Sequence, residues 1–371
     1  MSTEDEREIF LVALPGHEQP VAEEARAAGF KVTSVISGGV TVRGGWSEVW
    51  RANLYLRGPS RVLVRLGEFR AFHLAQLDKR SRKFPWTETL RSDVPVKVEA
   101  TCRRSKIYHA KAATQRVENA LTEAAGITVS PDASLVLKVR IEDDLVTFSL
   151  DSSGEGLHKR GHKQGVGKAP LRETMAAMFL RQMGYDGSQA VVDPMCGSGT
   201  ICIEAAEIAL GMPPGRSRHF AFESLASFDP SIWTTTRAGG AVPVPEITQR
   251  FFASDRDEGA VKMATKNAQR AGIGDLISFQ KHGVSELQRP DVPPGIVLVN
   301  PPYGARIGNR KVLFSLYGAL GKTLAERFGG WRVGIITSDG GLAKSTGLGL
   351  KPAGPPVAHG GLKVSLFQGQ C

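Results

Sequence analysis

The chain has 371 residues, 41% of them hydrophobic, which suits a globular protein of two or three domains. No apolar run is long enough to cross a membrane, and the stretch from Met1 to Glu8 is too acidic for a signal peptide. Four cysteines without zinc-ligand spacing predict reduced thiols, so we expect a cytoplasmic protein without a bound metal. A net charge of +10 with a pI near 9.5 favours an extended anionic partner, although a protein can be basic without one.

The first 55 residues predict a small α+β unit. Strands and helices follow one another in the order β-α-β-β, which is typical of a ferredoxin-like fold. The expected elements are a strand over 9–14, a helix over 18–28, strands over 31–35 and 40–42, and a helix from Trp46. Nothing in this unit has the character of a catalytic site.

A second unit is expected between Leu54 and about Leu150. Its alternating apolar residues predict strands, and its longer amphipathic stretches predict helices. The expected elements are strands over 61–69, 95–100, 135–140 and 145–150, and helices over 74–84 and 111–125.

Basic residues gather in this second unit and in the connector that follows it. A first cluster, 79–83, can be simply a solvated face. A second cluster has a serine, a tyrosine and a histidine interspersed, which favours phosphate contacts together with base stacking. The connector over 152–168 is rich in glycine and basic residues, so it could steer a nucleic acid strand. The residues predicted to contact RNA are Arg103, Arg104, Lys106, Lys159, Arg160 and Lys163.

A glycine-rich loop follows an apolar strand that ends at Asp193. Gly197 and Gly199 come next, and residues 200–210 have helical apolar spacing. The third glycine of a dinucleotide motif is replaced by Cys202, and the lysine of a P-loop is missing. An acidic residue at the strand tip suits a ligand with a cation, such as S-adenosylmethionine, although a glycine turn without a ligand is the alternative.

A second strand tip carries the residues Asn300, Pro301, Pro302 and Tyr303. Proline has no N–H group, so Pro301 offers only a carbonyl acceptor, and Asn300 adds a side-chain oxygen. These groups suit an exocyclic amine on a planar base, and Tyr303 offers a ring for stacking. We therefore predict that all four residues are catalytic.

Other strand tips are expected to complete the cofactor site. Asp255, at the end of a strand over 251–255, is the expected acceptor for the ribose hydroxyls, with Arg256 beside the adenine. Asp257 is expected to be a helix N-cap, and Cys196 a small packing residue. The segment over 211–250 is expected to pack on the catalytic domain, without a chemical role. The predicted cofactor-binding residues are Thr174, Asp193, Pro194, Met195, Cys196, Gly197, Ser198, Gly199, Thr200, Asp255, Arg256, His282, Gly283 and Asn300.

The loop over 193–200 together with Asn-Pro-Pro-Tyr resembles the class I, S-adenosylmethionine-dependent methyltransferases that act on amino groups. The stretches 51–57, 61–69, 157–161 and 169–177 are similar to the THUMP-containing guanine-N2 RNA methyltransferases, a family best represented by enzymes of large-subunit ribosomal RNA. The sequence departs from that family after the strand over 277–281, where His282 and Gly283 replace an acidic residue that often contacts the adenine amine.

The resemblance implies an α/β architecture with a Rossmann-like class I methyltransferase domain. Its sheet is expected to have seven mostly parallel strands and an antiparallel hairpin. The implied domains are a ferredoxin-like unit over 1–55, a THUMP RNA-binding domain over 56–155 and the methyltransferase domain over 156–371.

The implied reaction is methyl transfer to guanine N2 in RNA, with 23S ribosomal RNA favoured over transfer RNA. Methylation of adenine N6 in DNA remains an alternative, as does an inactive RNA-binding assembly factor. Nothing in the sequence indicates a dimer interface, so a monomer is assumed.

Overall fold

The computed structural model describes residues 6–164, 171–239, 250–304 and 310–371. It contains two compact units, neither of which is one continuous stretch of chain. The first unit comprises the residues up to Val12, Ala22–Leu157 and Arg218–Gly239. The second unit comprises Ala13–Val21, His158–Ser217 and the described residues after Gly239. Each unit is built on its own sheet.

The sheet of the first unit has the strand order β2-β3-β1-β4-β7-β6-β5. All neighbours are antiparallel except β5 and β6, which run parallel. Burial alternates along β6, so one face of this sheet is packed and the other faces solvent. The strands are β1 (Arg7–Val12), β2 (Lys31–Ile36), β3 (Gly39–Gly44), β4 (Arg61–Arg70), β5 (Val96–Arg103), β6 (Leu135–Glu142) and β7 (Leu145–Asp151).

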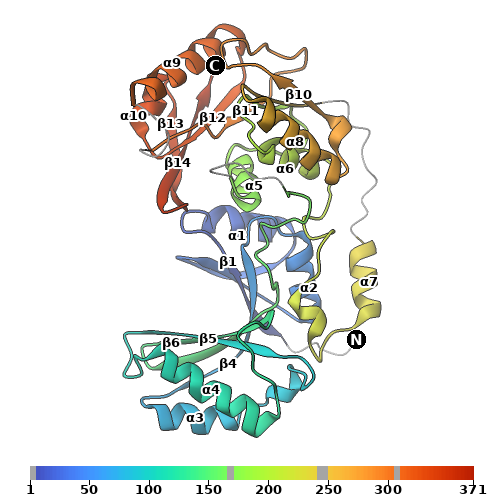
Figure 1. The fold of residues 1–371 in the computed structure, drawn as a ribbon, viewed down its shortest axis with the longest axis vertical. Coiled ribbons are helices and arrows are strands. Elements are labelled where there is room, and N and C mark those ends of the chain that lie inside the picture. Colours follow the sequence, from blue (N-terminus) through green and yellow to red (C-terminus); the bar gives the residue numbers. More distant parts are fainter. Residues whose placement is uncertain (1–5, 165–170, 240–249, 305–309) are drawn as a thin grey trace. The chain divides into compact units, whose positions relative to one another are not determined.

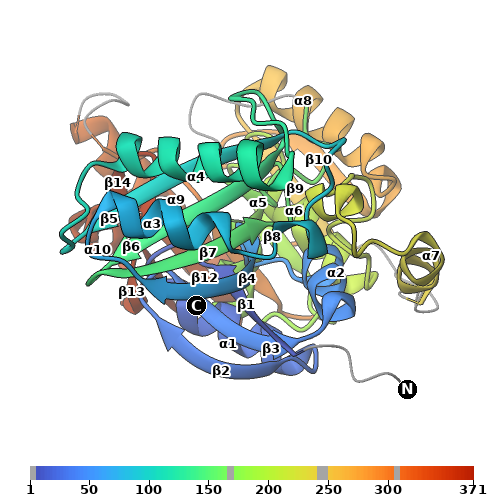
Figure 2. The ribbon, with the colours of Figure 1, turned by 90° about the horizontal axis from the view of Figure 1, so that it is seen from below.

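Helices α3 and α4 lie side by side on one face of the part of this sheet that contains β5 and β6 (Figures 1 and 2). Beneath them Trp86 packs on Phe148, with ring centroids 4.8 Å apart. The helices of the first unit are α2 (Trp46–Tyr55), α3 (Leu74–Arg82), α4 (Ala110–Ala125) and α7 (Pro230–Ala238), with short 3-10 turns at Trp86–Glu88 and Ala221–Ser224. Helix α1 (Glu18–Ala27) begins in the second unit and ends in the first.

The two small units that the sequence predicts share a single sheet. Strand β4 pairs with β1 through Arg61–Val64 and with β7 along Leu63–Arg70, so it belongs to both halves. Strand β4 has ten residues, which is long enough to pair with both neighbours. The alternation of apolar residues predicts a strand here but does not show that it joins the two units. The boundaries at 55 and 155 remain predictions.

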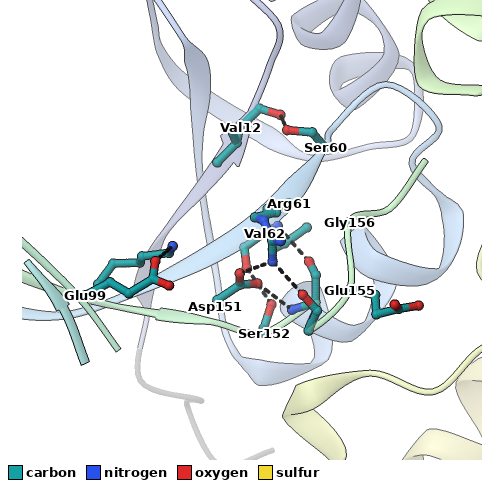
Figure 3. A network of polar contacts seen from close by, with 12 residues as sticks. Val12, Ser60, Arg61, Val62, Glu99, Asp151, Ser152, Glu155 and Gly156 are labelled. Atoms are coloured by element: carbon teal, nitrogen blue, oxygen red, sulfur yellow. Dashed lines mark hydrogen bonds and ion pairs between the residues drawn. The ribbon is translucent and has the colours of Figure 1, made fainter. Parts of the chain in front are cut away.

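A buried polar network fixes the place where the chain leaves this sheet (Figure 3). The guanidinium of Arg61 is bound to the carboxylate of Asp151 and donates to the carbonyl of Gly154 at 2.5 Å. Asp151 is fully buried, and this burial raises its pKa while the charge of Arg61 opposes the shift. The hydroxyl of Ser152 donates to the carbonyl of Val62 at 2.7 Å. The end of β7 is thereby held against the start of β4.

The segment Arg218–Gly239 belongs to the first unit, so the expectation that it packs on the catalytic domain was wrong. Its aromatic side chains need apolar partners, and helix α2 supplies one. The rings of Phe222 and Trp50 stack with centroids 6.0 Å apart, and Trp233 meets Phe222 edge-on at 5.0 Å. The Tyr55 hydroxyl also donates to the carbonyl of Thr236 at 2.7 Å. Aromatic content alone did not reveal which unit would bury these rings.

The sheet of the second unit has the order β10-β9-β8-β11-β12-β14-β13. The first five strands are parallel, and β14 and β13 form an antiparallel hairpin at the edge. This arrangement confirms the predicted fold class. The strands are β8 (Val191–Asp193), β9 (Phe251–Asp255), β10 (Ile277–Lys281), β11 (Ile296–Val299), β12 (Arg332–Thr337), β13 (Lys351–His359) and β14 (Leu362–Gln370).

The central strands β8 and β11 are buried along their whole length, as expected for parallel strands covered on both faces. Because β8 to β11 run parallel, their carboxyl ends meet at one edge of the sheet. The helices of this unit are α5 (Glu173–Gln182), α6 (Thr200–Ala209), α8 (Glu258–Arg270), α9 (Arg310–Arg327) and α10 (Gly340–Ser345). No helix in the described ranges is both long and apolar enough to cross a membrane.

The packing of α9 against the residue after α10 leads to a stability prediction. A Cβ atom added at Gly321 would lie 1.9 Å from the carbonyl oxygen of Thr346, so the two backbones must separate in Gly321→Ala. Overpacking of this kind costs about 1–3 kcal/mol. We expect a melting temperature lower by about 2–10 °C, measured by calorimetry.

Gly318→Ala on the same helix is the matched control. Its Cβ would meet Ser345 at an ordinary 3.7 Å, and alanine favours helix over glycine by up to about 1 kcal/mol. The melting temperature should stay constant or rise. Equal effects of the two substitutions would contradict the close approach.

Candidate active site

The central strand β8 ends in a buried carboxyl group. Asp193 is only 2% exposed, and its Oδ1 accepts a hydrogen bond from the backbone N–H of Met195 at 3.2 Å. Burial raises the pKa of Asp193 to about 8, and the nearby charge of Asp255 acts in the same direction. Near neutral pH the group is therefore largely protonated, and a cation placed beside it would favour the carboxylate.

The loop after β8 is held open by glycines at positive φ. Gly197 has φ of +53° and Gly199, the N-cap of α6, has φ of +84°. A Cβ at Gly199 would also lie 3.0 Å from that of Ala264 on α8. Cys196 is buried, and burial raises its thiol pKa, which fits a packing role better than that of a nucleophile.

The tip of β9 is bound to this loop. One carboxylate oxygen of Asp255 accepts from the N–H of Gly197 at 3.1 Å, and the other accepts from the N–H of Asp257 at 3.0 Å. The carboxylate of Asp257 accepts from the N–H of Gly259 at 2.8 Å, so the predicted N-cap is confirmed. Arg256, between the two, is exposed.

His282 and Gly283 follow β10 next to Asp255. The backbone N–H of His282 donates to the carbonyl of Asp255 at 3.1 Å, so the tips of β9 and β10 are linked. A cavity of about 270 Å³ opens beside His282. Its other walls come from β9, β10 and the segment 287–291.

The tip of β11 carries the four residues predicted to be catalytic. Pro301 is buried, and Tyr303 is 8% exposed, with its pKa raised to about 12 by burial, so its phenol stays neutral. The side-chain oxygen of Asn300 is buried and has no hydrogen-bond partner among the described residues. The hydroxyl of Tyr317, on α9, donates to the carbonyl of Pro302 at 3.3 Å and so anchors this turn.

Thr174 in the first turn of α5 presents a second buried polar atom. Its side chain is 1% exposed, and within the described ranges its hydroxyl has no hydrogen-bond partner. A buried polar group left without a partner costs about 1–3 kcal/mol, which a bound ligand can recover. Thr174 and Asn300 therefore offer groups that fit a polar cofactor. Of the other predicted cofactor residues, Pro194, Met195 and Ser198 lie in the loop between β8 and α6, and Thr200 is the first residue of α6.

Two of the residues predicted to bind RNA form ion pairs with glutamates inside the second unit. Arg160 is 2% exposed and donates from Nε to Glu204 at 3.0 Å, which leaves little of it for an RNA contact. Lys163 is partly buried, and its ammonium donates to the carbonyl of Leu171 at 3.0 Å and to the hydroxyl of Thr200 at 2.9 Å. Buried glutamates need cationic partners, and these two residues supply them. Lys159 remains exposed.

Three contributions to the site were not predicted from the sequence. Lys163 ties the connector to Thr200, at the start of α6, and Tyr317 anchors the β11 turn. Asn267 on α8 donates to the carbonyl of Ser198 at 3.0 Å and supports the glycine loop. Asn267 is a polar residue within the apolar stripe of α8, which was a usable signal for a buried hydrogen bond.

The remaining predicted RNA-binding residues belong to the first unit. They are Arg103, Arg104 and Lys106. All three are exposed. In the part of the chain that the structure describes, no group of acidic, histidine and cysteine side chains is arranged to hold a metal ion.

Comparison with known proteins identifies relatives along the chain. Residues 160–348 match a family model described as UPF0020, the RMKL-like methyltransferase domain, and residues 8–63 match the RlmL ferredoxin-like domain. SMU.472, a putative methyltransferase solved in complex with SAH, is 27% identical over 98% of each chain, with a TM-score of 0.87. A predicted N6-adenine-specific DNA methylase from Listeria monocytogenes str. 4b F2365 is 29% identical over 98% of this chain and 96% of its own, with a TM-score of 0.85.

TrmN from Thermus thermophilus is 22% identical over 98% of this chain and 100% of its own, with a TM-score of 0.73, which shows a shared fold. Together with the strand tips described above, these likenesses define a methyltransferase whose cofactor is S-adenosylmethionine. Within that class, the chain belongs to the UPF0020 family of RMKL-like methyltransferase domains, whose model spans just over half of its residues.

The buried Asp193 leads to a pH prediction. Its raised pKa of about 8 means that the free protein holds a proton there at pH 6–7. If Asp193 contacts the ammonium group of the cofactor, binding favours the carboxylate and expels that proton. Affinity for S-adenosylhomocysteine should then increase as pH rises from 6 towards 8, by up to about tenfold per unit. Calorimetry in buffers of different ionisation enthalpy should detect the released proton.

Asp193→Asn is the control for this titration, because an amide has similar shape and no proton to lose. Its affinity should be lower than that of the unaltered protein and nearly constant over the same pH range. A pH dependence that persists in Asp193→Asn would assign the titration to another group.

Proposed function

We propose that this protein transfers a methyl group from S-adenosylmethionine to the exocyclic N2 amine of a guanosine in RNA, with 23S ribosomal RNA as the favoured substrate. The observation that carries the proposal is the buried, unpartnered side-chain oxygen of Asn300 at the tip of β11, where the described residues supply no donor. An amine with two N–H groups supplies the donor that this oxygen lacks.

Two acceptors side by side would orient the amine. Its hydrogens point to the side-chain oxygen of Asn300 and the carbonyl of Pro301, so that the nitrogen lone pair faces away from both. Tyr303 stacks on the base once it has left its helix or loop. The hydrogen bond from Tyr317 to Pro302 keeps this turn in place before the substrate arrives. Positioning and charge placement supply most of the rate in such a site.

The cofactor supplies an electrophilic methyl group on a sulfonium. We assign its amino group to Asp193 and its ribose hydroxyls to Asp255, with the glycine loop between them. Arg256, His282 and Gly283 are the proposed neighbours of the adenine, and Thr174 adds a hydroxyl. The amine loses its proton after the transfer, so no general base is assigned.

Support for RNA comes from the amino-terminal match and from the charge of the whole chain. Residues 8–63 match the RlmL ferredoxin-like domain, and the chain carries a net charge of +10. On this basis we propose that 1–55 is ferredoxin-like, 56–155 a THUMP domain and 156–371 the methyltransferase domain. The Listeria relative, by its name, favours adenine N6 in DNA as a second candidate, because that amine has the same two donors.

Incubation with labelled S-adenosylmethionine distinguishes the substrates. Ribosomal RNA, transfer RNA and DNA are offered separately, and each is digested to nucleosides afterwards. We expect label in N2-methylguanosine of 23S ribosomal RNA. Label in transfer RNA would change the assigned substrate from ribosomal to transfer RNA. Label in N6-methyladenine of DNA would contradict the assignment of both guanine and RNA. No label, with no binding of S-adenosylhomocysteine, would favour an inactive RNA-binding factor.

Asn300→Ala tests the acceptor. Removing one acceptor aimed at the reacting amine should lower kcat by about 10²–10³-fold. Affinity for S-adenosylhomocysteine should fall much less, which also shows that the variant is folded. Asn119→Ala is the matched control and should keep full activity. Asn119 lies on α4, and its side-chain oxygen accepts an exposed hydrogen bond from Gln115. A full rate in Asn300→Ala would remove Asn300 from the mechanism.

A further inference from the structure

Strand directions bring three segments of the first unit to one edge of its sheet. Strand β4 is antiparallel to β7, β7 is antiparallel to β6, and β6 is parallel to β5. Strands β4, β5 and β6 therefore all end at the same edge. The residues there are 71–73 after β4, 103–109 after β5 and the turn 143–144 after β6, and we call them the aromatic edge. Two intervening strands separate β4 from β5 by about 14 Å.

This edge exposes two large aromatic side chains. Tyr108 is 73% exposed and Phe72 is 41% exposed, and a histidine follows each of them in the sequence. The rings of Tyr108 and His109 lie 4.3 Å apart, and the ammonium of Lys106 lies 5.0 Å from the centre of the Phe72 ring. One exposed aromatic residue is ordinary, but two at one edge, each beside a cation or an imidazole, indicate a surface that contacts something.

The backbone of the aromatic edge is strained. Among the described residues, positive φ outside glycine occurs only here, at Arg104 (+46°), Asp143 (+51°) and Asp144 (+62°). Such conformations cost about 1–3 kcal/mol each and persist only where the surroundings enforce them.

Side chains of the same edge enforce this conformation. The guanidinium of Arg104 binds Glu142 at 2.8 Å and Asp143 at 3.0 Å. The carboxylate of Asp144 accepts from the N–H of Lys106 at 2.7 Å. Arg104 and the acidic residues of this turn are thus engaged with one another. The side chains of Arg103 and Lys106 stay exposed, so the edge presents cations and rings in a fixed arrangement.

We propose that the aromatic edge binds an unpaired stretch of the RNA substrate, with bases stacked on Tyr108 and Phe72 and phosphates beside Lys106 and Arg103. This inference rests on the proposed function, because it takes RNA as the substrate. Unpaired bases offer their faces to aromatic rings, whereas the bases of a duplex are already stacked on one another. Exposed cations at the same edge as the two rings match a strand with one charge per nucleotide.

Binding of fluorescent oligoribonucleotides to the full chain, followed by anisotropy, tests this site without methyl transfer. The probes are an unstructured 12-mer and a blunt duplex of the same length. Stacking on one ring contributes about 1–3 kcal/mol, so Tyr108→Ala should weaken binding of the single strand by about 5–150-fold. The salt dependence should not change in this variant, because no charge is lost.

Further variants separate stacking from charge. Tyr108→Trp should keep the affinity of the unaltered protein, and Lys106→Met should reduce the slope of log affinity against log salt by about 0.7. Ile36→Ala is the matched control, since Ile36 is an exposed apolar residue of the same unit at 49% and lies on β2. It should bind the single strand normally. An unchanged circular dichroism spectrum and melting temperature check that each variant is folded.

Unchanged single-strand affinity in Tyr108→Ala would overturn the inference, as would an equal loss for single strand and duplex. The proposed function fails separately, through label in DNA or in a base other than guanine. Selective loss of single-strand binding in Tyr108→Ala would support the aromatic edge even in that case.

Discussion

A carboxyl group buried at the end of the central strand is the constraint on which the site depends. Asp193 can be buried because β8 has a strand on each side and apolar residues on both faces, which excludes water from its tip. The same exclusion raises its pKa, so the group is poised to ionise when a cation arrives. The neighbouring tips are aligned with it because their strands run parallel.

Much of the polar structure around this carboxyl group serves to hold its neighbours. Asp255 binds the backbone of the glycine loop, Asn267 supports the same loop from α8, and Lys163 joins the connector to the start of α6. The contact of Asn267 is buried and the other two are partly buried, so breaking one would leave a polar or charged group without its partner. The shape of the loop is therefore set before a ligand binds. Thr174 and Asn300 each keep a buried polar atom without a partner among the described residues, and we propose that these two atoms contact ligands.

The sequence predicted the features that depend on local patterns. The position of the glycine loop and the N-cap at Asp257 follow from short motifs with fixed geometry. The mostly parallel sheet with its antiparallel hairpin was implied by the family resemblance, and the order of its strands was not predicted. The ion pairs of Arg160 and Lys163 could not be predicted, because their partners Glu204 and Glu173 are identified only once α5 and α6 are packed. A run of charges has the same appearance whether it faces solvent or a buried acid.

Long-range pairings were beyond these patterns as well. The two small units are joined through β4, which pairs with strands distant in the sequence. The burial of Phe222 likewise depends on its packing against Trp50, a residue far away in the sequence. The choice between guanine and adenine is equally absent from the motif, since both amines present two hydrogens to the same acceptors. The acceptors that we propose at the tip of β11 would select an amine, and they would not distinguish the base that carries it.

The route of the chain through its two units limits how this protein can be divided or recombined. A cut at Leu157 would separate the rings of Phe222 and Trp233 from Trp50 on α2, although both belong to the first unit. It would also leave Ala13–Val21 on the wrong fragment. Neither half can be excised as a cassette with a complete core, so exchange between relatives should preserve both halves together.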